Sequence, residues 1–90
     1  MSGDQNEPSS KSALVLLAEG AEEMEVVIVV DVLRRAKVQV TLAGLNDSGG
    51  RATAVVECSR QIRIQPDCSL DHVVKEKTTF DMIVLPGKRN

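Results

Sequence analysis

Aromatic residues are almost absent from this chain: its 90 residues include no Trp, no Tyr and a single Phe, Phe80. A hydrophobic core must therefore be built from Val, Ile, Leu and Ala, the residues that dominate buried parallel sheets. The hydrophobic fraction of 42% and the charged fraction of 27% are ordinary for a globular protein. The length fits one small domain or part of a larger one.

Long apolar runs and a strong net charge are also missing. The runs at 13–18 and 26–30 are far too short to span a bilayer, and the first residues lack the apolar core of a signal peptide. A net charge of −2 attracts neither nucleic acid nor an anionic membrane. We expect neither partner, and we predict a disordered polar tail at 1–11 before a domain at 12–90.

The chain has only two cysteines, Cys58 and Cys68, which do not make a disulfide framework and favour a reducing, cytosolic compartment. Together with His72, which we expect to face solvent, they offer only three soft metal ligands. We therefore expect no metal, and we expect no cofactor. Cys68 is predicted at a helix start, where the helix dipole would lower its thiol pKa and make it the more reactive cysteine.

Apolar periodicity and turn residues predict an alternating α/β pattern of the doubly wound kind. The predicted elements are a strand at 13–18, a helix at 22–36, a strand at 38–45, an antiparallel pair at 53–58 and 61–65 joined around Ser59 and Arg60, a short helix capped by Asp67 or Ser69, and a strand at 80–87. The segment 46–50 is predicted to be a loop. The first strand, helix and next strand should form a right-handed βαβ unit.

The helix at 22–36 contains a β-branched run, but its charges recur with helical period. One side gathers Glu23, Asp31, Arg34 and Arg35; the other gathers Ile28, Val29, Val32, Leu33 and Ala36. Acidic residues come first and arginines last, which suits the helix dipole. We therefore predict that the apolar side faces the sheet and that Glu22 and Glu23 lie on the surface.

Glu25 falls on the apolar side of this helix, where partial desolvation would favour its protonated form. Two interpretations remain open. The carboxylate reaches back to a free backbone N–H, as in a capping box, or it shares a proton in a crevice at the strand ends, where perturbed groups tend to be functional. In doubly wound folds ligands bind beyond the carboxyl ends of the strands, which points to "AEGAEE" and "LPGKRN".

Two other site types fit these segments poorly. A phosphate site is disfavoured because "AEGAEE" has one glycine and three acids. A phosphoacceptor receiver domain needs an aspartate at the carboxyl end of a later central strand. Asp81 instead begins the strand at 80–87, which ends with Pro86 and Gly87.

Five motifs then stand together over residues 12–87: G-A-E-E-M-E, D-V-L-R-R-A, C-S-R, P-D-x-S-L and F-D-x-I-V-L-P-G. With them the chain resembles the N-terminal half of the parkinsonism-associated deglycase family in the ThiJ/PfpI superfamily. The resemblance implies a flavodoxin-like doubly wound sandwich, a homodimer and a redox-sensitive cysteine nucleophile on a strand-to-helix elbow. It also implies glutathione-independent glyoxalase- and deglycase-type activity on dicarbonyls, oxidative-stress protection, chaperone-like action, and a cytoplasmic, nuclear or mitochondrial location.

The same resemblance assigns roles to individual residues. It implies that Glu25 hydrogen-bonds the nucleophilic cysteine and that Gly87 begins a loop lending backbone donors to the site. Arg60 would approach the active site of the dimer mate. Cys58 would be a peripheral cysteine near the dimer interface, and Met24 would lie in that interface.

The chain also departs from the family pattern. The family's nucleophile lies beyond residue 90, and neither Cys58 nor Cys68 takes its place, although Cys68 is a redox candidate. Lys88 replaces a second loop glycine, and Lys37 replaces a glycine that ends the helix. We therefore expect an N-terminal part that is inactive alone and marginally stable or oligomeric. The alternatives are a non-catalytic module that pairs with a full-length relative, and a truncated isoform without function.

Overall fold

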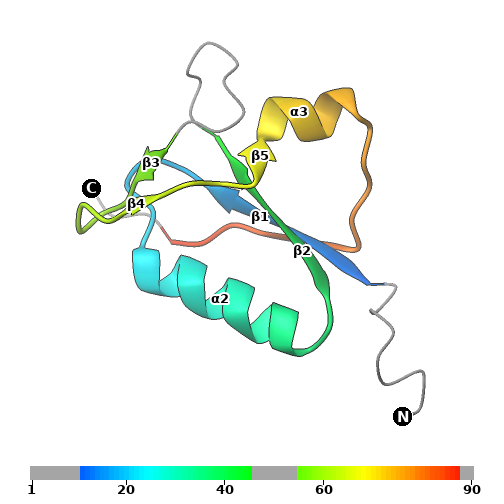
Figure 1. The fold of residues 1–90 in the computed structure, drawn as a ribbon, viewed down its shortest axis with the longest axis horizontal. Coiled ribbons are helices and arrows are strands. Elements are labelled where there is room, and N and C mark those ends of the chain that lie inside the picture. Colours follow the sequence, from blue (N-terminus) through cyan, green and yellow to red (C-terminus); the bar gives the residue numbers. More distant parts are fainter. Residues whose placement is uncertain (1–10, 46–54, 88–90) are drawn as a thin grey trace.

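The computed structural model describes residues 11–45 and 55–87. In chain order the elements are β1 (Ser12–Leu17), α2 (Glu23–Arg35), β2 (Gln39–Gly44), β3 (Val56–Glu57), β4 (Arg63–Ile64), β5 (Cys68–Ser69), α3 (Leu70–Lys75) and β6 (Met82–Val84). Four strands form a parallel sheet in the order β5-β2-β1-β6. β3 and β4 form a separate antiparallel ribbon, as predicted but shorter. The predicted α/β class is confirmed (Figure 1).

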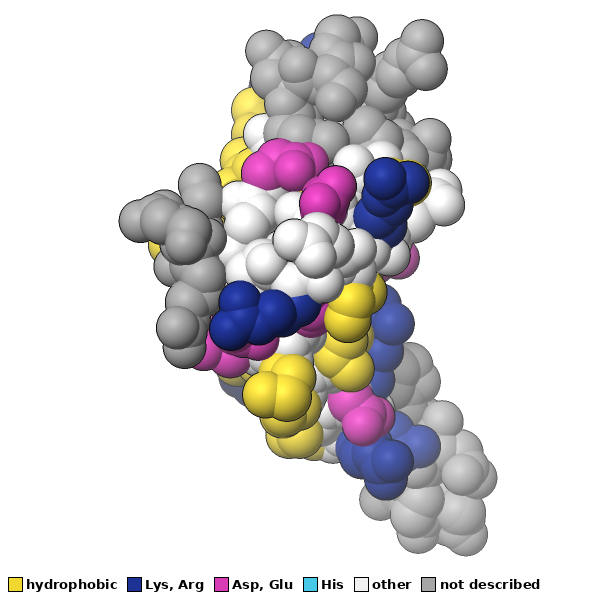
Figure 2. Space-filling model, turned by 90° about the vertical axis from the view of Figure 1, so that its left-hand side faces the viewer, with side chains coloured by type: hydrophobic (Ala, Val, Ile, Leu, Met, Phe, Trp, Pro, Cys, Tyr) yellow, Lys and Arg dark blue, Asp and Glu magenta, His cyan; other side chains and the backbone are white. Residues whose placement is uncertain are grey.

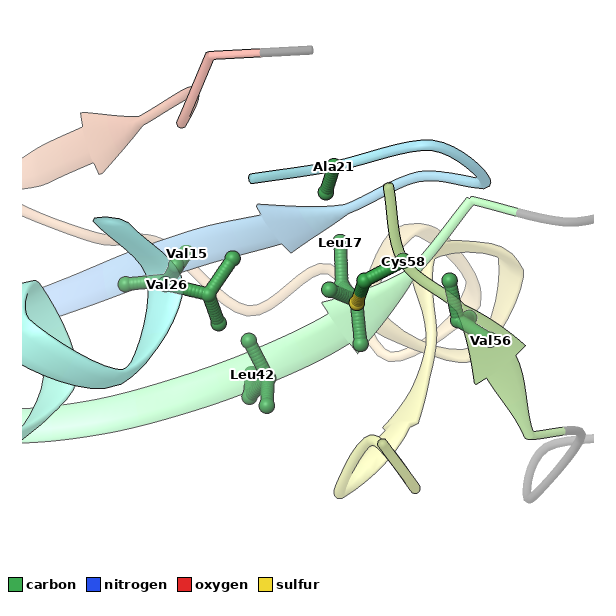
Figure 3. Close-up of a cluster of buried hydrophobic side chains, with 7 residues drawn as sticks. All are labelled: Val15, Leu17, Ala21, Val26, Leu42, Val56 and Cys58. Atoms are coloured by element: carbon green, nitrogen blue, oxygen red, sulfur yellow. The ribbon is translucent and has the colours of Figure 1, made fainter. Parts of the chain in front are cut away.

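The two helices cover opposite faces of the sheet (Figure 1). The side chains of β1 alternate between these faces, as a strand requires. Val15 and Leu17 join the larger cluster with Val26 of α2, whereas Leu14 joins a smaller cluster with Val73 of α3. Figure 3 shows that the larger cluster lies between β1, β2, α2 and the ribbon. Its fully buried side chains are Val15, Leu17, Val26 and Val56.

The predicted orientation of α2 is only half right. Val29 and Leu33 pack against the core, but Ile28 and Val32 are 58% and 56% exposed. Glu23, predicted on the surface, is buried. The reason is that α2 is apolar around most of its circumference, so its sequence does not single out one face for the sheet.

The C-terminal end of α2 closes with a Schellman motif. The Val38 N–H donates to the Leu33 carbonyl and the Lys37 N–H to the Arg34 carbonyl, at N···O distances of 3.0 Å each. This geometry puts Lys37 in the left-handed region, at φ 68°. A side chain there is strained, and glycine is the residue usually found at this position.

Lys37→Gly is therefore expected to raise the free energy of unfolding by about 0.5–1 kcal/mol, because relief of the left-handed strain exceeds the extra backbone entropy of glycine. Urea denaturation at a fixed protein concentration measures the change. The control is Lys37→Ala, which removes the same charge and keeps the strain. A glycine variant no more stable than the alanine variant would contradict this account.

Two predicted elements need correction. The strand predicted at 80–87 is shorter, since β6 has three residues and forms one edge of the sheet. Its side chains are largely exposed, with Ile83 at 66% and the following Leu85 at 70%, because no described element covers them. At the opposite edge, β5 was not predicted at all.

Asp67 and Ser69 set the path of the chain around β5. Asp67 exchanges two hydrogen bonds of 2.8 Å with Leu42, one through its backbone N–H and one through its carboxylate. Of the two candidate helix caps, Ser69 is the one that caps α3, since its Oγ accepts from the His72 N–H at 3.1 Å. His72 is exposed, as predicted.

Some predictions fall outside the described residues. These are the loop at 46–50, the first residues of the strand at 53–58, Lys88 and the tail except Lys11. The Lys11 carbonyl accepts from the Gln39 N–H at 3.1 Å. Within residues 11–45 and 55–87, no helix combines the length and hydrophobicity needed to cross a membrane.

Candidate functional site

Glu25 and Gly87 are brought together at the carboxyl end of the sheet. The Gly87 N–H donates to Glu25 Oε1 at 2.7 Å, and the Gly87 carbonyl accepts from the Glu22 N–H at 2.8 Å. The first turn of α2 thus holds both polar groups of Gly87. This contact joins residues 62 positions apart and fixes the chain after β6 against the helix.

The capping-box interpretation of Glu25 is wrong, because its carboxylate bonds to Gly87 and not to the helix N-cap. The cap is Glu22, whose side chain accepts from the Met24 N–H at 3.3 Å. The expected burial of Glu25 is also not found: its side chain is exposed among the described residues. Contact with the strand end, rather than burial, distinguishes this carboxylate.

Glycine at position 87 permits the close approach of the Glu25 carboxylate. A Cβ atom added to Gly87 would lie 2.8 Å from Glu25 Oε1, well inside van der Waals distance. A larger residue would push the carboxylate away and break the hydrogen bond to the backbone. The sequence F-D-M-I-V-L-P-G therefore ends in the residue that this approach needs.

An apolar groove of about 470 Å³ extends from Glu25 between α2 and the end of β6. Its lining residues are Glu25, Ile28, Val29, Val32, Val84, Leu85 and Pro86. The single carboxylate lies among aliphatic side chains. A segment or ligand that fills this groove would desolvate Glu25, which the described residues alone do not do.

Glu23 is the carboxylate that the sequence interpretation missed. It is only 4% exposed, and it accepts from Ser59 Oγ at 2.9 Å, the Arg60 N–H at 2.7 Å and the Ile62 N–H at 3.3 Å. Burial would raise the pKa of Glu23, but hydrogen bonds from its own backbone and from these three donors outweigh burial and hold the pKa below its ordinary value. Helical periodicity alone could not reveal donors supplied by a turn far along the chain.

Met24 and Arg60 line a second groove, of about 750 Å³, between α2 and the ribbon. Met24 is 68% exposed, and the groove also contains the apolar side chains of Val27, Ile28, Ile62 and Ile64. Figure 2 looks onto this end of the molecule, where hydrophobic side chains lie beside acidic and basic ones. The interface role of Met24 and the active-site role of Arg60 remain predictions.

The two cysteines lie in different surroundings, and the interface role of Cys58 remains a prediction. Cys58 lies in the core at 3% exposure (Figure 3), where burial, followed by the charges of Glu23, Glu19 and Glu22, raises its thiol pKa. Cys68 lies in β5 rather than at the start of α3. Burial and the neighbouring Asp67 raise its thiol pKa, so the predicted lowering by a helix dipole is wrong. Its redox role stays a prediction.

Metal-ligating side chains do not gather in the described parts of the chain. Across residues 11–45 and 55–87, no group of three or more His, Cys, Asp or Glu residues could hold a metal ion. The chemistry available here is that of a carboxylate, a backbone N–H and apolar grooves.

Comparisons with known proteins give the context of this site. Protein dj-1beta of Drosophila melanogaster is 60% identical over 78 residues, which are 87% of this chain and 38% of that protein. The glutathione-independent glyoxalase DJR-1.2 of Caenorhabditis elegans is 44% identical over 80 residues, or 88% of this chain and 39% of that protein. The chain thus spans less than two fifths of the length of these relatives.

Solved structures agree with the sequence comparisons. The crystal structure of Drosophila melanogaster DJ-1beta superposes with a TM-score of 0.77 at 54% identity, covering 89% of this chain and 39% of that one. The oxidised Toxoplasma gondii DJ-1 structure has a TM-score of 0.77 at 34% identity, covering 88% and 39%. The sequence model of the DJ-1/PfpI family matches residues 11–90, and the chain belongs to this family.

Proposed function

We propose that this chain contributes the acid and a backbone donor of a cysteine-dependent site that converts reactive dicarbonyls without glutathione. The observation that carries the proposal is the 2.7 Å hydrogen bond from the Gly87 N–H to Glu25, at the carboxyl end of the parallel sheet. The glyoxalase name of the nematode relative, which is 44% identical, supports the same activity.

Each group has a chemical task in such a site. A protonated Glu25 carboxyl would donate a hydrogen bond to a thiolate and favour the reactive form of the nucleophile. Once a substrate displaces its contact with Glu25, the Gly87 N–H would stabilise the oxyanion that forms when the thiolate attacks a carbonyl carbon. An oxidised sulfinate would accept hydrogen bonds from the same donors.

The thiol itself has to come from outside the residues described here. Cys58 is enclosed in the core, and Cys68 lies in β5, at the opposite edge of the sheet from β6. Both thiols have raised pKa values, which is unfavourable for a nucleophile. We therefore propose that the 90 residues alone do not turn over dicarbonyls.

The test measures consumption of methylglyoxal by two proteins. The 90-residue chain should show no turnover. A chimaera in which residues 12–87 replace the matching segment of the nematode glyoxalase should be active, and Glu25→Gln should lower its rate by about 100-fold or more, as for loss of a general acid or base.

The matched control is Asp31→Asn, which neutralises another exposed carboxylate of α2, one that pairs with Arg35. It should leave the rate of the chimaera within about twofold, because exposed ion pairs contribute little. Turnover by the 90 residues alone, or full activity of the Glu25→Gln chimaera, would contradict the proposal.

A second candidate function is a docking module that pairs with a copy of itself or with a full-length relative. The observation that favours it is the exposed apolar surface of α2 and β6, which includes Met24, Val27, Ile28, Ile83 and Leu85 at 56–70% exposure. Contiguous exposed apolar side chains of this kind mark interaction sites. Electrostatic repulsion between two copies does not oppose such pairing, since the net charge is only −2.

A further inference from the structure

The turn between β3 and β4 has few hydrogen bonds of its own. The ribbon pairs only Val56 with Ile64 and Glu57 with Arg63. Within the turn, the Cys58 N–H donates to the Ile62 carbonyl and the Gln61 N–H to the Cys58 carbonyl, both at 2.9 Å. Gln61 is in the left-handed region at φ 66°, an unfavourable conformation for a residue with a side chain. The turn therefore depends on contacts from outside the ribbon.

Glu23 supplies the largest share of these outside contacts. Its two carboxylate oxygens accept from three donors of the turn, on Ser59, Arg60 and Ile62, at 2.7–3.3 Å. Hydrogen bonds to an ionised carboxylate are roughly twice as strong as those between neutral groups. Protonation places a hydrogen on one of these oxygens and removes the charge that strengthens the bonds to both.

Hydrogen bonds stabilise the charge of Glu23, namely those from the turn and one from its own backbone. Arg60 contacts the Glu23 carboxylate through its backbone N–H, and Cys58, which follows β3, is influenced by the charges of Glu23, Glu19 and Glu22 together. The other two glutamates have the same charge as Glu23. Within residues 11–45 and 55–87, no ion pair involves the Glu23 carboxylate.

We propose that Glu23 is an acid-sensitive latch: ionised, it holds the turn at 59–62 against the start of α2, and protonated, it releases this turn while the parallel sheet stays folded. Release would change the 750 Å³ groove, because Arg60 and Ile62 form part of its wall. The latch uses neither Glu25 nor Gly87, so it stands or falls separately from the catalytic proposal.

The direction of the pH dependence follows from the pKa of Glu23, which is lower in the folded protein than the ordinary 4.5. A carboxyl group with a lowered pKa contributes stability that is fully present above the ordinary value and is lost as the pH falls through the folded-state pKa. The release should therefore occur below pH 4.5.

Amide hydrogen exchange of the 90-residue chain, followed by NMR and corrected for the intrinsic rate at each pH, tests the latch. As the pH is lowered from about 6 through the acid range in which the sheet stays folded, the protection of the Arg60 and Ile62 amides should fall by about tenfold or more. The Leu45 amide, which donates to the Leu17 carbonyl at 2.8 Å, should keep its protection and so report on the sheet.

Two variants test the assignment to Glu23. Glu23→Gln should show low protection at Arg60 and Ile62 already at about pH 6, with no further fall in acid. Ser59→Ala removes one donor and should raise the midpoint of the acid transition. The matched control, Glu22→Gln, should keep the wild-type profile. If Glu23→Gln does not fold, the wild-type profile and the Ser59→Ala midpoint decide.

Three results would overturn the latch. One is protection at Arg60 and Ile62 that persists throughout the acid range in which the Leu45 amide stays protected. The second is loss of their protection in step with the Leu45 amide, which would mean that the sheet unfolds together with the turn. The third is loss of the acid transition in Glu22→Gln or an unchanged midpoint in Ser59→Ala.

Discussion

Leu17→Ala is expected to lower the free energy of unfolding by about 2–5 kcal/mol, the usual cost of removing a buried leucine side chain and leaving a cavity. Leu17, at the end of β1, is fully buried in the larger cluster, together with side chains of α2 and the ribbon (Figure 3). Since a chain of this length has a total stability of about 5–13 kcal/mol at most, this loss is a large fraction of it. Urea denaturation followed by circular dichroism measures the change.

Leu85→Ala makes the same change at a surface position and is the matched control. Leu85 is 70% exposed, so its truncation should change the free energy of unfolding by about 0.5 kcal/mol or less. Both variants have to be compared at one protein concentration, because self-association adds to apparent stability. Equal costs at the two positions would contradict the core described here.

Ile28→Lys is expected to weaken self-association of the 90-residue chain by about tenfold or more, because it places a charge at the centre of an apolar contact surface. Ile28 is 58% exposed and lines both grooves on α2, so a partner that covers either groove meets it. Sedimentation velocity over a range of concentrations measures the effect.

The matched control for this prediction is Val74→Lys. Val74 is 64% exposed on α3, on the opposite face of the sheet from α2. Its replacement should leave the association unchanged. A chain that is monomeric at all concentrations would contradict the prediction that α2 is a docking surface. A control variant that dissociates as readily as Ile28→Lys would contradict it as well.

Much of the architecture could be predicted from the sequence because its signals are local. Short apolar runs mark β1 and β2, and the charge pattern places α2 within one residue at each end. β5 could not be predicted, because it has only two residues, Cys68 and Ser69, and exists through its pairing with Ala43 and Gly44. Such a strand has no periodicity of its own.

The candidate site likewise could be predicted only in part. Glu25 stands out by its place on the apolar side of the predicted helix and Gly87 through the family motifs, and the structure places them in contact. The burial of Glu23 could not be predicted, because a glutamate in a first helical turn usually faces water. Its donors come from a turn 36–39 positions away, and a helical projection contains no information about them.

The exposure of β6 has a related cause. An apolar run such as M-I-V-L indicates a strand that can be buried, but its burial depends on neighbouring elements. Among the described residues β6 has one neighbouring strand, β1, and its other edge is free. The side chains of β6 are therefore apolar enough for a buried strand, but the described residues do not bury them.

The place of β1 within the sheet has a consequence for biosynthesis. β1 pairs with β2 soon after both leave the ribosome, but its other partner is β6, and Ser12 hydrogen-bonds to Asp81 across 69 positions. Until β6 has been synthesised, the nascent chain therefore presents one side of β1 unpaired. Unpaired strand edges in growing chains are the sites that aggregate and that chaperones bind.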